Sequence, residues 1–260
     1  DRFYMPLILT PLMGIPLVKP GDDLAVMILE SLHFEGIELQ DGDVIVLAQK
    51  IVSKAEGRRV RQDAFIPSKE AVSLAEITGK SPHLIQAVLE ESKKVIRAVP
   101  HTIIAEHKNG FICANAGIDH SNVEVNEGDV PDDWILLLPE DADRSANAIR
   151  TELEAVSGKK IAVLIIDSHG RPWRVGTVGV TIGVSGMPAL VDLRGKPDLF
   201  GRELLVTQVA AADELAAGAS LMMGQANEAS PVVHVRGFPY SLRESSLQEL
   251  IRPETQDLFR

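Results

Sequence analysis

Two loops of the sequence combine an aspartate with oxygen-bearing neighbours. One covers residues 115–122 and contains Asp119, and the other covers residues 165–170 and contains Asp167 followed by Ser168. Carboxylate, hydroxyl and amide oxygens are the ligands that hard cations such as Mg²⁺ prefer, and Mn²⁺ often replaces Mg²⁺ at such sites. The residue types therefore predict a divalent-metal site, although an aspartate in such a loop also commonly caps a helix or forms a turn.

Cationic and aromatic side chains near these loops offer contacts for anions and for flat rings. Lys54 follows the first predicted strand, and Arg171 and Arg174 flank Trp173 after the second acidic loop. An arginine binds phosphate or carboxylate through two hydrogen bonds, whereas a lysine acts as a mobile point charge. Taken singly, each of these cations is better interpreted as a solvated surface residue. Trp173 can stack on a flat ring system or belong to the core.

The sequence lacks the common phosphate-binding motifs. Gly79-Lys80-Ser81 is similar to the end of a P-loop, but Leu74 stands where the first glycine is required and a predicted helix precedes the tripeptide. The glycines over residues 176–186 do not match the dinucleotide fingerprint, and residues 183–187 lack the last glycine of a nucleophile elbow. A bound nucleotide would therefore need another arrangement of contacts.

Buried strands and amphipathic helices must position these groups. The β-branched runs over residues 44–48 and 161–166 are typical of buried strands, and polar candidates follow each run directly, namely Gln49-Lys50 and Asp167-Ser168-His169-Gly170. Further strands are expected over residues 95–112 as a hairpin, 134–138, 176–186 and 231–237. Apolar residues at helical spacing, with capping residues at the ends, predict helices over residues 24–32, 68–77, 81–91, 142–156 and 204–223.

Composition limits the possible classes of protein. A chain of 260 residues with 45% hydrophobic content can bury a substantial core, as one large domain or two small ones. The net charge of −11 disfavours a nucleic-acid partner, which needs a basic surface. No apolar run approaches the roughly 18 residues of a membrane span, so we expect a soluble, cytoplasmic protein without a membrane partner. The single cysteine, Cys113, cannot form an internal disulfide, and we expect it in the core.

The order of several motifs resembles the coenzyme F-420-0:gamma-glutamyl ligase family. The matching pieces are Gly14-Ile15-Pro16-Leu17 with Gly21-Asp22-Asp23-Leu24, Ser53-Lys54-Ala55-Glu56-Gly57, Ala87-Val88-Leu89-Glu90-Glu91-Ser92, Asn115-Ala116-Gly117-Ile118-Asp119 with Ser121-Asn122-Val123, Asp167-Ser168-His169-Gly170-Arg171, Gly201-Arg202-Glu203-Leu204, Ala212-Asp213-Glu214, Met223-Gly224 and Val235-Arg236-Gly237. No single piece is specific. Their joint order, over roughly residues 12–237, indicates the family.

This resemblance implies a reaction. In the family, GTP phosphorylates a carboxylate of the deazaflavin precursor, coenzyme F-420-0, to an acyl phosphate; the amine of L-glutamate then displaces phosphate and forms a gamma-linked amide. Metal ions neutralise phosphate charge in such transfers, so the resemblance implies Mg²⁺ or Mn²⁺ at two sites, with K⁺ as a further candidate. Two alternatives stay open, which are a ligase or kinase of the same architecture for another acidic small molecule, and a nucleotide-binding subunit without turnover.

The resemblance also implies roles for particular residues. Catalytic positions match Asp119, Asp167 and Lys54, and metal-binding positions match Asp119, Asp167, Ser168 and Gln225. Nucleotide-contacting positions match Ile15, Pro16, Leu17, Val18, Gln49, Lys50, Lys54, Asn122, Met223, Gly224, Gln225, Ala226, Asn227 and Glu228. Two departures concern the fine geometry: Gln225 is a neutral amide at an expected metal contact, with Glu228 nearby, and Gln49-Lys50 stands where relatives can carry small hydroxyl residues.

The fold implied by the family is an unusual α+β arrangement. Mixed sheets with flanking helices form two intertwined parts, and two chains build a homodimer. We therefore expect residues 1–260 to form a single ligase module. In some relatives a C-terminal flavin-binding domain follows this module, and residues 250–254 are similar to the junction, so the sequence is compatible with an excised module or a stand-alone enzyme.

Overall fold

A computed structural model of the chain describes residues 6–120 and 133–257. Its helices are α1 (Leu24–Phe34), α2 (Gln49–Ala55), α3 (Lys69–Thr78), α4 (Pro82–Glu90), α5 (Ala142–Ser157) and α6 (Ala211–Met223). The main sheet contains β1 (Ile8–Pro11), β2 (Val44–Ala48), β8 (Ala162–Arg171), β9 (Arg174–Ser185) and β12 (Val232–Arg236). The smaller sheets pair β3 (Arg59–Arg61) with β7 (Trp134–Leu136), β4 (Ser92–Val99) with β5 (Thr102–His107) and β6 (Ile112–Ala114), and β10 (Val191–Asp192) with β11 (Gln208–Val209). The predicted α+β class is confirmed.

The main sheet is mixed and has the strand order β1-β12-β2-β8-β9. β2 and β8 pair in parallel, whereas β12 is antiparallel to both β1 and β2, and β9 is antiparallel to β8. Both β2 and β8 are apolar over their central residues because helices cover the two faces of the sheet, as the sequence predicted. The carboxyl ends of β1, β2 and β8 and the amino end of β12 consequently lie at one edge.

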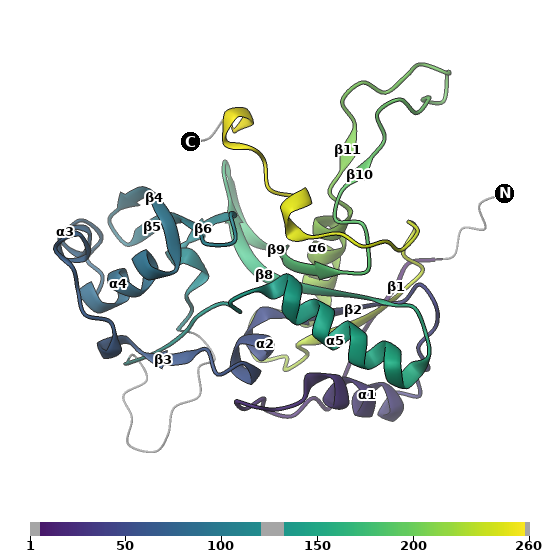
Figure 1. Cartoon of the computed structure of the whole chain (residues 1–260), viewed down its shortest axis with the longest axis horizontal. Coiled ribbons are helices and arrows are strands. Elements are labelled where there is room, and N and C mark those ends of the chain that lie inside the picture. The colour runs from purple at the N-terminus through teal and green to yellow at the C-terminus, as the bar shows by residue number, and fades with distance from the viewer. Residues whose placement is uncertain (1–5, 121–132, 258–260) are drawn as a thin grey trace.

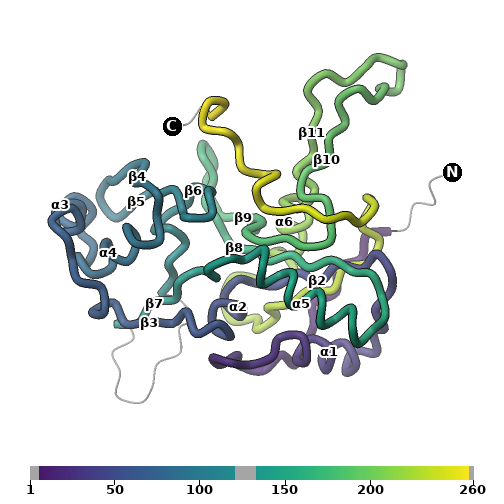
Figure 2. The backbone as a smooth tube through the Cα atoms, viewed as in Figure 1, coloured from purple at the N-terminus to yellow at the C-terminus, as the bar shows by residue number. Residues whose placement is uncertain are grey.

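Two cores flank this sheet. α1 and α5 pack on one face through residues such as Ile28 and Leu153, and α6 packs on the other through Leu215 and Ala219. Figures 1 and 2 show α5 and α1 below the strands and α6 behind them. The sheet is therefore the rigid middle layer of a three-layer arrangement, and its edge can hold loops in fixed positions.

A third core belongs to a subdomain inserted between α2 and α5. α3, α4 and the β4-β5-β6 sheet enclose it, and its fully buried residues include Ile85, Ile103 and Ile135. Figure 1 shows this subdomain on the left of the main sheet, with the β3-β7 ribbon beneath it. The hairpin expected over residues 95–112 lies here as β4, β5 and the start of β6.

Three of the six described helices have the expected capping bond at their start. Asp23, Ser68 and Asp141 each accept a hydrogen bond from a backbone N–H in the first turn of the helix that follows. Ser81 occupies the N-cap of α4 but makes no capping bond, and Pro82 starts the helix. Gly79 ends α3 with a φ of 69°, which explains the false similarity of Gly79-Lys80-Ser81 to a P-loop.

Two predicted boundaries are wrong, and one helix was not predicted. Asp167 does not end its strand, because pairing with β9 continues β8 to Arg171. α6 begins at Ala211 rather than Leu204, since residues 204–210 run along the β10-β11 ribbon and make backbone bonds there, such as Leu204 N to the Lys196 carbonyl. A short helix, α2, also forms where only a polar segment was foreseen.

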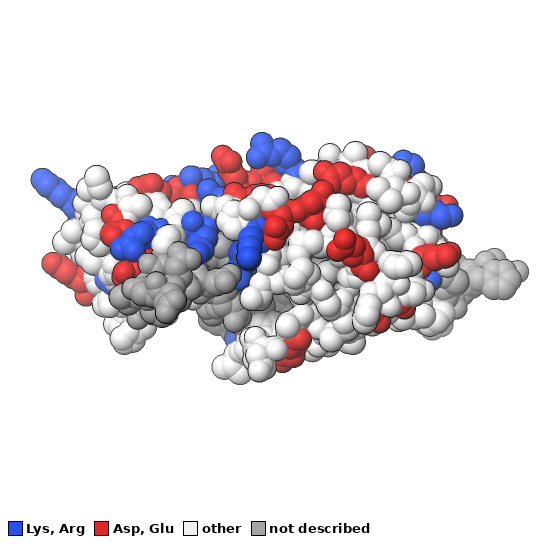
Figure 3. All heavy atoms as spheres, turned by 90° about the horizontal axis from the view of Figure 1, so that it is seen from below, with Lys and Arg blue, Asp and Glu red and all other residues white. Residues whose placement is uncertain are grey.

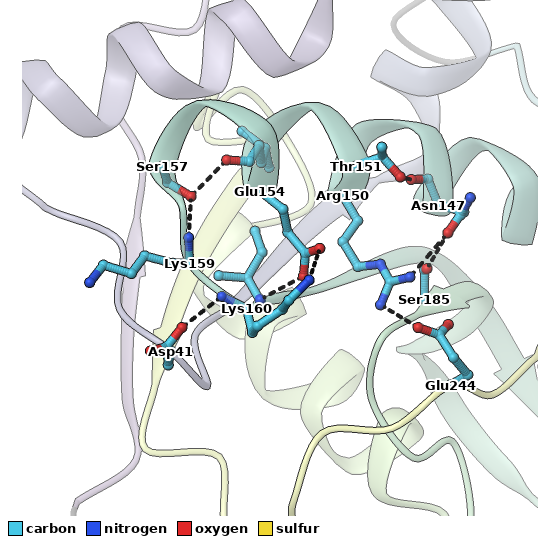
Figure 4. Close-up of polar contacts among 12 residues, drawn as sticks. Asp41, Asn147, Arg150, Thr151, Glu154, Ser157, Lys159, Lys160, Ser185 and Glu244 are labelled. Carbon is cyan, nitrogen blue, oxygen red and sulfur yellow. Dashed lines mark hydrogen bonds and ion pairs between the residues drawn. The ribbon is translucent and has the colours of Figure 1, made fainter.

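α5 ties the sheet to the segment after β12. The Arg150 guanidinium contacts Glu244 at 2.8 Å and Asn147 at 3.2 Å, and Asn147 also accepts from Ser185 of β9 (Figure 4). The same helix ends at Gly158, beyond which the backbone N–H of Lys160 donates to Asp41 at 2.7 Å. These contacts fix the amino ends of β2 and β8 relative to α5.

The surface carries one extended projection and a mixture of charges. Residues 190–209, with β10 and β11 at their base, rise well away from the sheet in Figure 1. On the face drawn in Figure 3, acidic and basic side chains are intermingled rather than gathered into a continuous basic surface. Within the described part of the chain, no helix has the length and apolarity needed to cross a membrane.

Candidate functional site

A cavity of about 660 Å³ lies at the edge where the strands converge. Four segments reach it from the main sheet: the chain after β1, the start of α2 after β2, the middle of β8, and the loop before β12. Backbone bonds hold these segments together, with Leu12 N donating to the Val232 carbonyl and Ala48 N to the Pro231 carbonyl, both at 2.8 Å. The predicted nucleotide segments Ile15-Pro16-Leu17-Val18 and Met223-Gly224-Gln225-Ala226-Asn227-Glu228 both line this cavity.

The wall formed by α2 brings one amide and two cations to the cavity. Gln49 is buried, and its Oε1 accepts from Ser53 Oγ at 2.9 Å. Its Nε2 has no hydrogen-bond partner within the described residues. Lys50 and Lys54 follow on the same short helix and also line the cavity. A buried amide N–H without a partner is costly, so Gln49 is suited to donate to a ligand.

Asp167 and Ser168 face the cavity from the part of β8 that extends past β2. One carboxylate oxygen of Asp167 accepts from the backbone N–H of Ser168 at 2.8 Å, and the other contacts His169 Nε2 at 3.0 Å. Ser168 Oγ donates to Gln225 Oε1 at 3.0 Å, which joins β8 to the loop before β12. Two predicted metal ligands from distant parts of the sequence are thus in direct contact.

His169 is itself held by the inserted subdomain. The Phe111 ring lies between His107 and His169, with ring centroids 4.9 Å and 5.5 Å away. Burial and the charge of the nearby Lys108 together lower the pKa of His107 to about 4, so its imidazole is neutral at neutral pH. This row of rings restricts the orientation of His169 and therefore of the Asp167 carboxylate. No local pattern of the sequence shows this stacking, because His107 and Phe111 lie far from His169 in the chain.

Asp119 reaches the cavity from the inserted subdomain. A turn of left-handed residues, Asn115, Ala116 and Gly117, precedes it, and a side chain at Gly117 would clash with Leu138, since an added Cβ lies 2.3 Å from Leu138 Cδ1. Backbone bonds in both directions then pair Asp119 with Leu136 of β7. The cavity is consequently shared between the subdomain and the main sheet.

An ion pair links a predicted nucleotide-contacting residue to a predicted metal ligand. Lys50 Nζ lies 2.7 Å from Asp119 Oδ2, and about a quarter of each side chain is exposed. Sequence reasoning assigned Lys50 to the nucleotide and Asp119 to a metal, and it did not foresee that they meet. Nothing local in the sequence indicates this contact, because the two positions are 69 apart along the chain.

The loop after α6 is closed by Glu228. Its carboxylate accepts from the backbone N–H of Ala226 at 2.8 Å, and this backbone bond lowers the pKa of Glu228. Gly224 has a φ of 73°, and an added Cβ there would lie 2.2 Å from the Glu228 carboxyl carbon. Only glycine leaves room for this closure. Glu228 therefore shapes the loop beside Gln225, within the same cavity wall.

The oxygen atoms around the cavity fit a hard cation that binds together with a phosphate-bearing ligand. Within the described ranges, no three His, Cys, Asp or Glu side chains form a ready-made metal cluster. Mg²⁺ is usually held by one or two carboxylates together with phosphate oxygens and water, rather than by a cage of protein groups. Asp119, Asp167, Ser168 and Gln225 surround one cavity with oxygens of the required kind.

Two further expectations concern single residues. Asn122, for which a nucleotide contact was predicted, lies outside the described residues. Cys113 is buried as expected, and burial raises the pKa of its thiol to about 12, which keeps it protonated and unreactive.

Comparisons with known proteins agree with this organisation. The family model described as F420-0:Gamma-glutamyl ligase matches residues 13–237. The chain is 47% identical over 249 residues to the coenzyme F420:L-glutamate ligase of Methanothermobacter thermautotrophicus, which covers 95% of this chain and 96% of that protein. It is 44% identical to the protein of the same name from Methanocaldococcus jannaschii, over 248 residues that cover 95% of each chain. It is also 44% identical to that of Archaeoglobus fulgidus, over 250 residues that cover 96% of this chain and 95% of that one. The similarity spans both the main sheet and the inserted subdomain.

Proposed function

The chain belongs to the F420-0:gamma-glutamyl ligase family and is a ligase, and we propose that it uses GTP to join L-glutamate to coenzyme F-420-0 and its extended forms. The observation that carries this proposal is the shared cavity. Asp119 from the subdomain and Asp167 from the main sheet line it together with Lys54. A scaffold protein has no physical reason to gather two carboxylates and a lysine from three distant segments.

The cavity supports a nucleotide as the activating substrate. Its volume of about 660 Å³ lies in the range of small-molecule sites. Ile15-Pro16-Leu17-Val18 supplies an apolar edge suited to a base, and Gln49 Nε2 is a buried donor that needs an acceptor. Lys54 supplies a charge for the phosphates, as a lysine does in other nucleotide sites. Asn122 keeps its proposed nucleotide contact from the family resemblance alone.

The proposed reaction has two steps. An oxygen of the precursor carboxylate attacks the γ-phosphorus of GTP, so that a C–O–P bond forms and the bond from this phosphorus to GDP breaks. The amine of L-glutamate, after losing a proton, attacks the acyl carbon; a C–N bond forms, the C–O bond breaks and phosphate leaves. The products are an amide, GDP and phosphate. The released phosphate carries the oxygen that the precursor carboxylate loses.

The protein's own groups orient the reactants and balance their charge. We assign Mg²⁺ or Mn²⁺, and K⁺ as a further ion, to Asp119, Asp167, Ser168 and Gln225. These residues would hold a divalent cation, which would supply positive charge against the phosphates. His169 and Phe111 hold Asp167 in place, and Lys50 balances Asp119. Lys54 holds phosphate oxygens in line with the attacking carboxylate.

We further propose that residues 1–260 form one ligase module of two intertwined subdomains that works as a cytoplasmic homodimer. Supporting this, the projection over residues 190–209 exposes four large apolar side chains along its length, which are Leu199 (98% exposed), Phe200 (89%), Leu205 (76%) and Val206 (85%). Such a patch is typical of a protein interface. Sedimentation equilibrium tests it: Leu199→Asp with Phe200→Asp should give monomers, and a monomeric parent protein would contradict the assembly.

The decisive experiment measures phosphate release and product mass together. Purified protein is incubated with GTP, Mg²⁺, L-glutamate and coenzyme F-420-0, and matched reactions omit one component at a time. Release that needs both acceptor and glutamate, with mass gains of whole glutamyl units, supports the ligase. Phosphate release with another acidic acceptor, or GTP binding without turnover, would instead support the two alternatives and contradict the proposal.

A further inference from the structure

The segment after β12 runs back across the main sheet and ends against the inserted subdomain. Residues 238–257 form it, and its two short helical turns cover Leu247–Glu249 and Glu254–Gln256. Figure 1 shows the segment in yellow, crossing β9 in the view and ending above β6. None of its residues lines the cavity, so any effect of the segment on the reaction must be indirect.

The middle of this segment is fixed to the main sheet and to α5. Leu247 is buried, and its backbone N–H donates to the Asp143 carboxylate on α5 at 2.9 Å. Asp143 also accepts from Val184 N of β9 at 2.8 Å, so one carboxylate joins the segment to both elements. Leu250 packs against the core between the main sheet and α6. Residues 247–250 therefore keep their position relative to the main sheet.

The next residues contact the subdomain at β4 and at the turn between β5 and β6. Gly110 is buried in this turn, and an added Cβ there would lie 3.5 Å from Cγ2 of Ile251. The Ile251 side chain therefore covers the turn. Nearby, Glu254 forms an ion pair with Lys94 of β4. Because an exposed ion pair contributes little stability, the apolar contact of Ile251 carries most of this attachment.

The covered turn leads directly to the row of rings that holds Asp167. Gly110 N donates to the His107 carbonyl at 2.8 Å and closes the turn. Phe111 follows at once, and its ring lies between those of His107 and His169. His169 Nε2 in turn lies 3.0 Å from the Asp167 carboxylate. A displacement of the turn would therefore move the ring that orients this carboxylate.

Contacts inside the cavity cannot hold the two parts in one position throughout a reaction. Lys50 and Asp119 join them at a distance of 2.7 Å, but both residues are also proposed to contact ligands. A ligand charge near either residue weakens their mutual attraction. The contacts of Leu247 and Ile251 lie outside the cavity and do not depend on what is bound there.

We propose that residues 247–254 clamp the subdomain to the main sheet, and that Ile251 is a positioning residue for the ligase reaction. Ile251 acts through the β5-β6 turn and the row of rings on the orientation of Asp167. The same attachment sets the place of Asp119, which belongs to the subdomain, relative to Asp167. The positioning role rests on the proposed ligase function, because that function requires both carboxylates in fixed places.

Hydrogen exchange measures the clamp without using the reaction. Ile251→Ala removes the two side-chain atoms that lie nearest to Gly110, Cγ1 and Cγ2. Amide exchange over residues 107–112 should therefore become about threefold faster or more in the ligand-free protein. Ile251→Val keeps both atoms and should exchange like the parent protein. Exchange over β2 should stay the same in both variants, and unchanged exchange at the turn in Ile251→Ala would overturn the clamp.

Steady-state kinetics measure the positioning role. Ile251→Ala should lower kcat by about tenfold, because Asp167 is held less precisely, whereas the KM for GTP should change by less than about twofold. Ile251→Val should keep the kcat of the parent protein. Leu242→Ala is the matched control, because Leu242 is a partly buried residue of the same segment that packs against the main-sheet core. It should change neither kcat nor exchange at the β5-β6 turn.

The outcomes separate the clamp from the ligase function. Faster exchange in Ile251→Ala with an unchanged kcat would contradict the positioning role. An equal fall of kcat in Leu242→Ala would also contradict it, because general loss of packing would then explain the effect. A parent protein without ligase activity would overturn the ligase function and the positioning role together, and the exchange experiment would still decide whether the clamp exists.

Discussion

Replacing Asp43 by asparagine should destabilise the main sheet at the edge opposite the cavity. Asp43 precedes β2 and is almost fully buried. Its carboxylate accepts from Gln40 N at 2.9 Å, from His234 Nε2 at 2.8 Å, and from Arg236 through Nε at 3.0 Å and Nη2 at 2.8 Å. These contacts join the start of β2 to β12. Asparagine keeps the shape of the side chain but removes the charge and one acceptor oxygen.

The size of the effect follows from the pKa of Asp43. Burial alone would raise this pKa, but hydrogen bonds from His234, Arg236 and the backbone of Gln40 outweigh it and lower the pKa from 3.8 to about 2. That difference corresponds to about 2.5 kcal/mol of unfolding free energy at neutral pH. Breaking one side of a buried ion pair costs about 3–5 kcal/mol. We therefore expect Asp43→Asn to lose about 3 kcal/mol.

The pH dependence has a definite sign. A lowered carboxyl pKa stabilises the folded state above the unfolded-state pKa, and this contribution is lost as the pH falls through the folded-state pKa. The difference between the parent protein and Asp43→Asn should thus be constant above about pH 5 and shrink between about pH 4 and pH 2. Urea unfolding at pH 7, 5, 4 and 3 measures it, with the exposed Glu35→Gln as control. A loss under about 1 kcal/mol at pH 7, or a difference that grows on acidification, would refute this reasoning.

Three other substitutions test the site and the packing of the fold. Asp167→Ala should lower ligase turnover by about a thousandfold, because it removes charge from the proposed metal site. The unfolding free energy should change by less than about 1 kcal/mol. Near-normal turnover in a steady-state assay would contradict the metal assignment. Lys54→Ala should weaken GTP binding by about tenfold without affecting the acceptor, and equal GTP affinities in a titration would return Lys54 to an ordinary surface role. Gly183→Ala should lower the unfolding free energy by about 2–3 kcal/mol in urea unfolding, since the added Cβ would lie 2.5 Å from the Ala142 carbonyl. Gly218→Ala in α6 is the control. Its added Cβ meets only a side chain at 3.4 Å, so this variant should not destabilise the protein.

Local sequence patterns determined much of the secondary structure. The strand over residues 44–48 was predicted with its observed bounds, and α5 and β12 to within one residue at each end. These elements depend on their own apolar spacing and capping residues, which the sequence displays directly. The boundaries at Asp167 and Leu204 failed because strand pairing and the β10-β11 ribbon, rather than local preference, decide where those elements end.

The residue types of the site were also visible in the sequence, but their arrangement was not. Motif order selected Asp119, Asp167 and Lys54, and chemistry explained why such residues could serve a ligase. Only the tertiary structure brought Lys50 into an ion pair with Asp119, because their two segments belong to different subdomains. It alone showed that Trp173 is exposed rather than part of the core, since burial depends on what packs around a residue. Residue identity sets the chemistry that is possible, and long-range packing sets which groups meet to perform it.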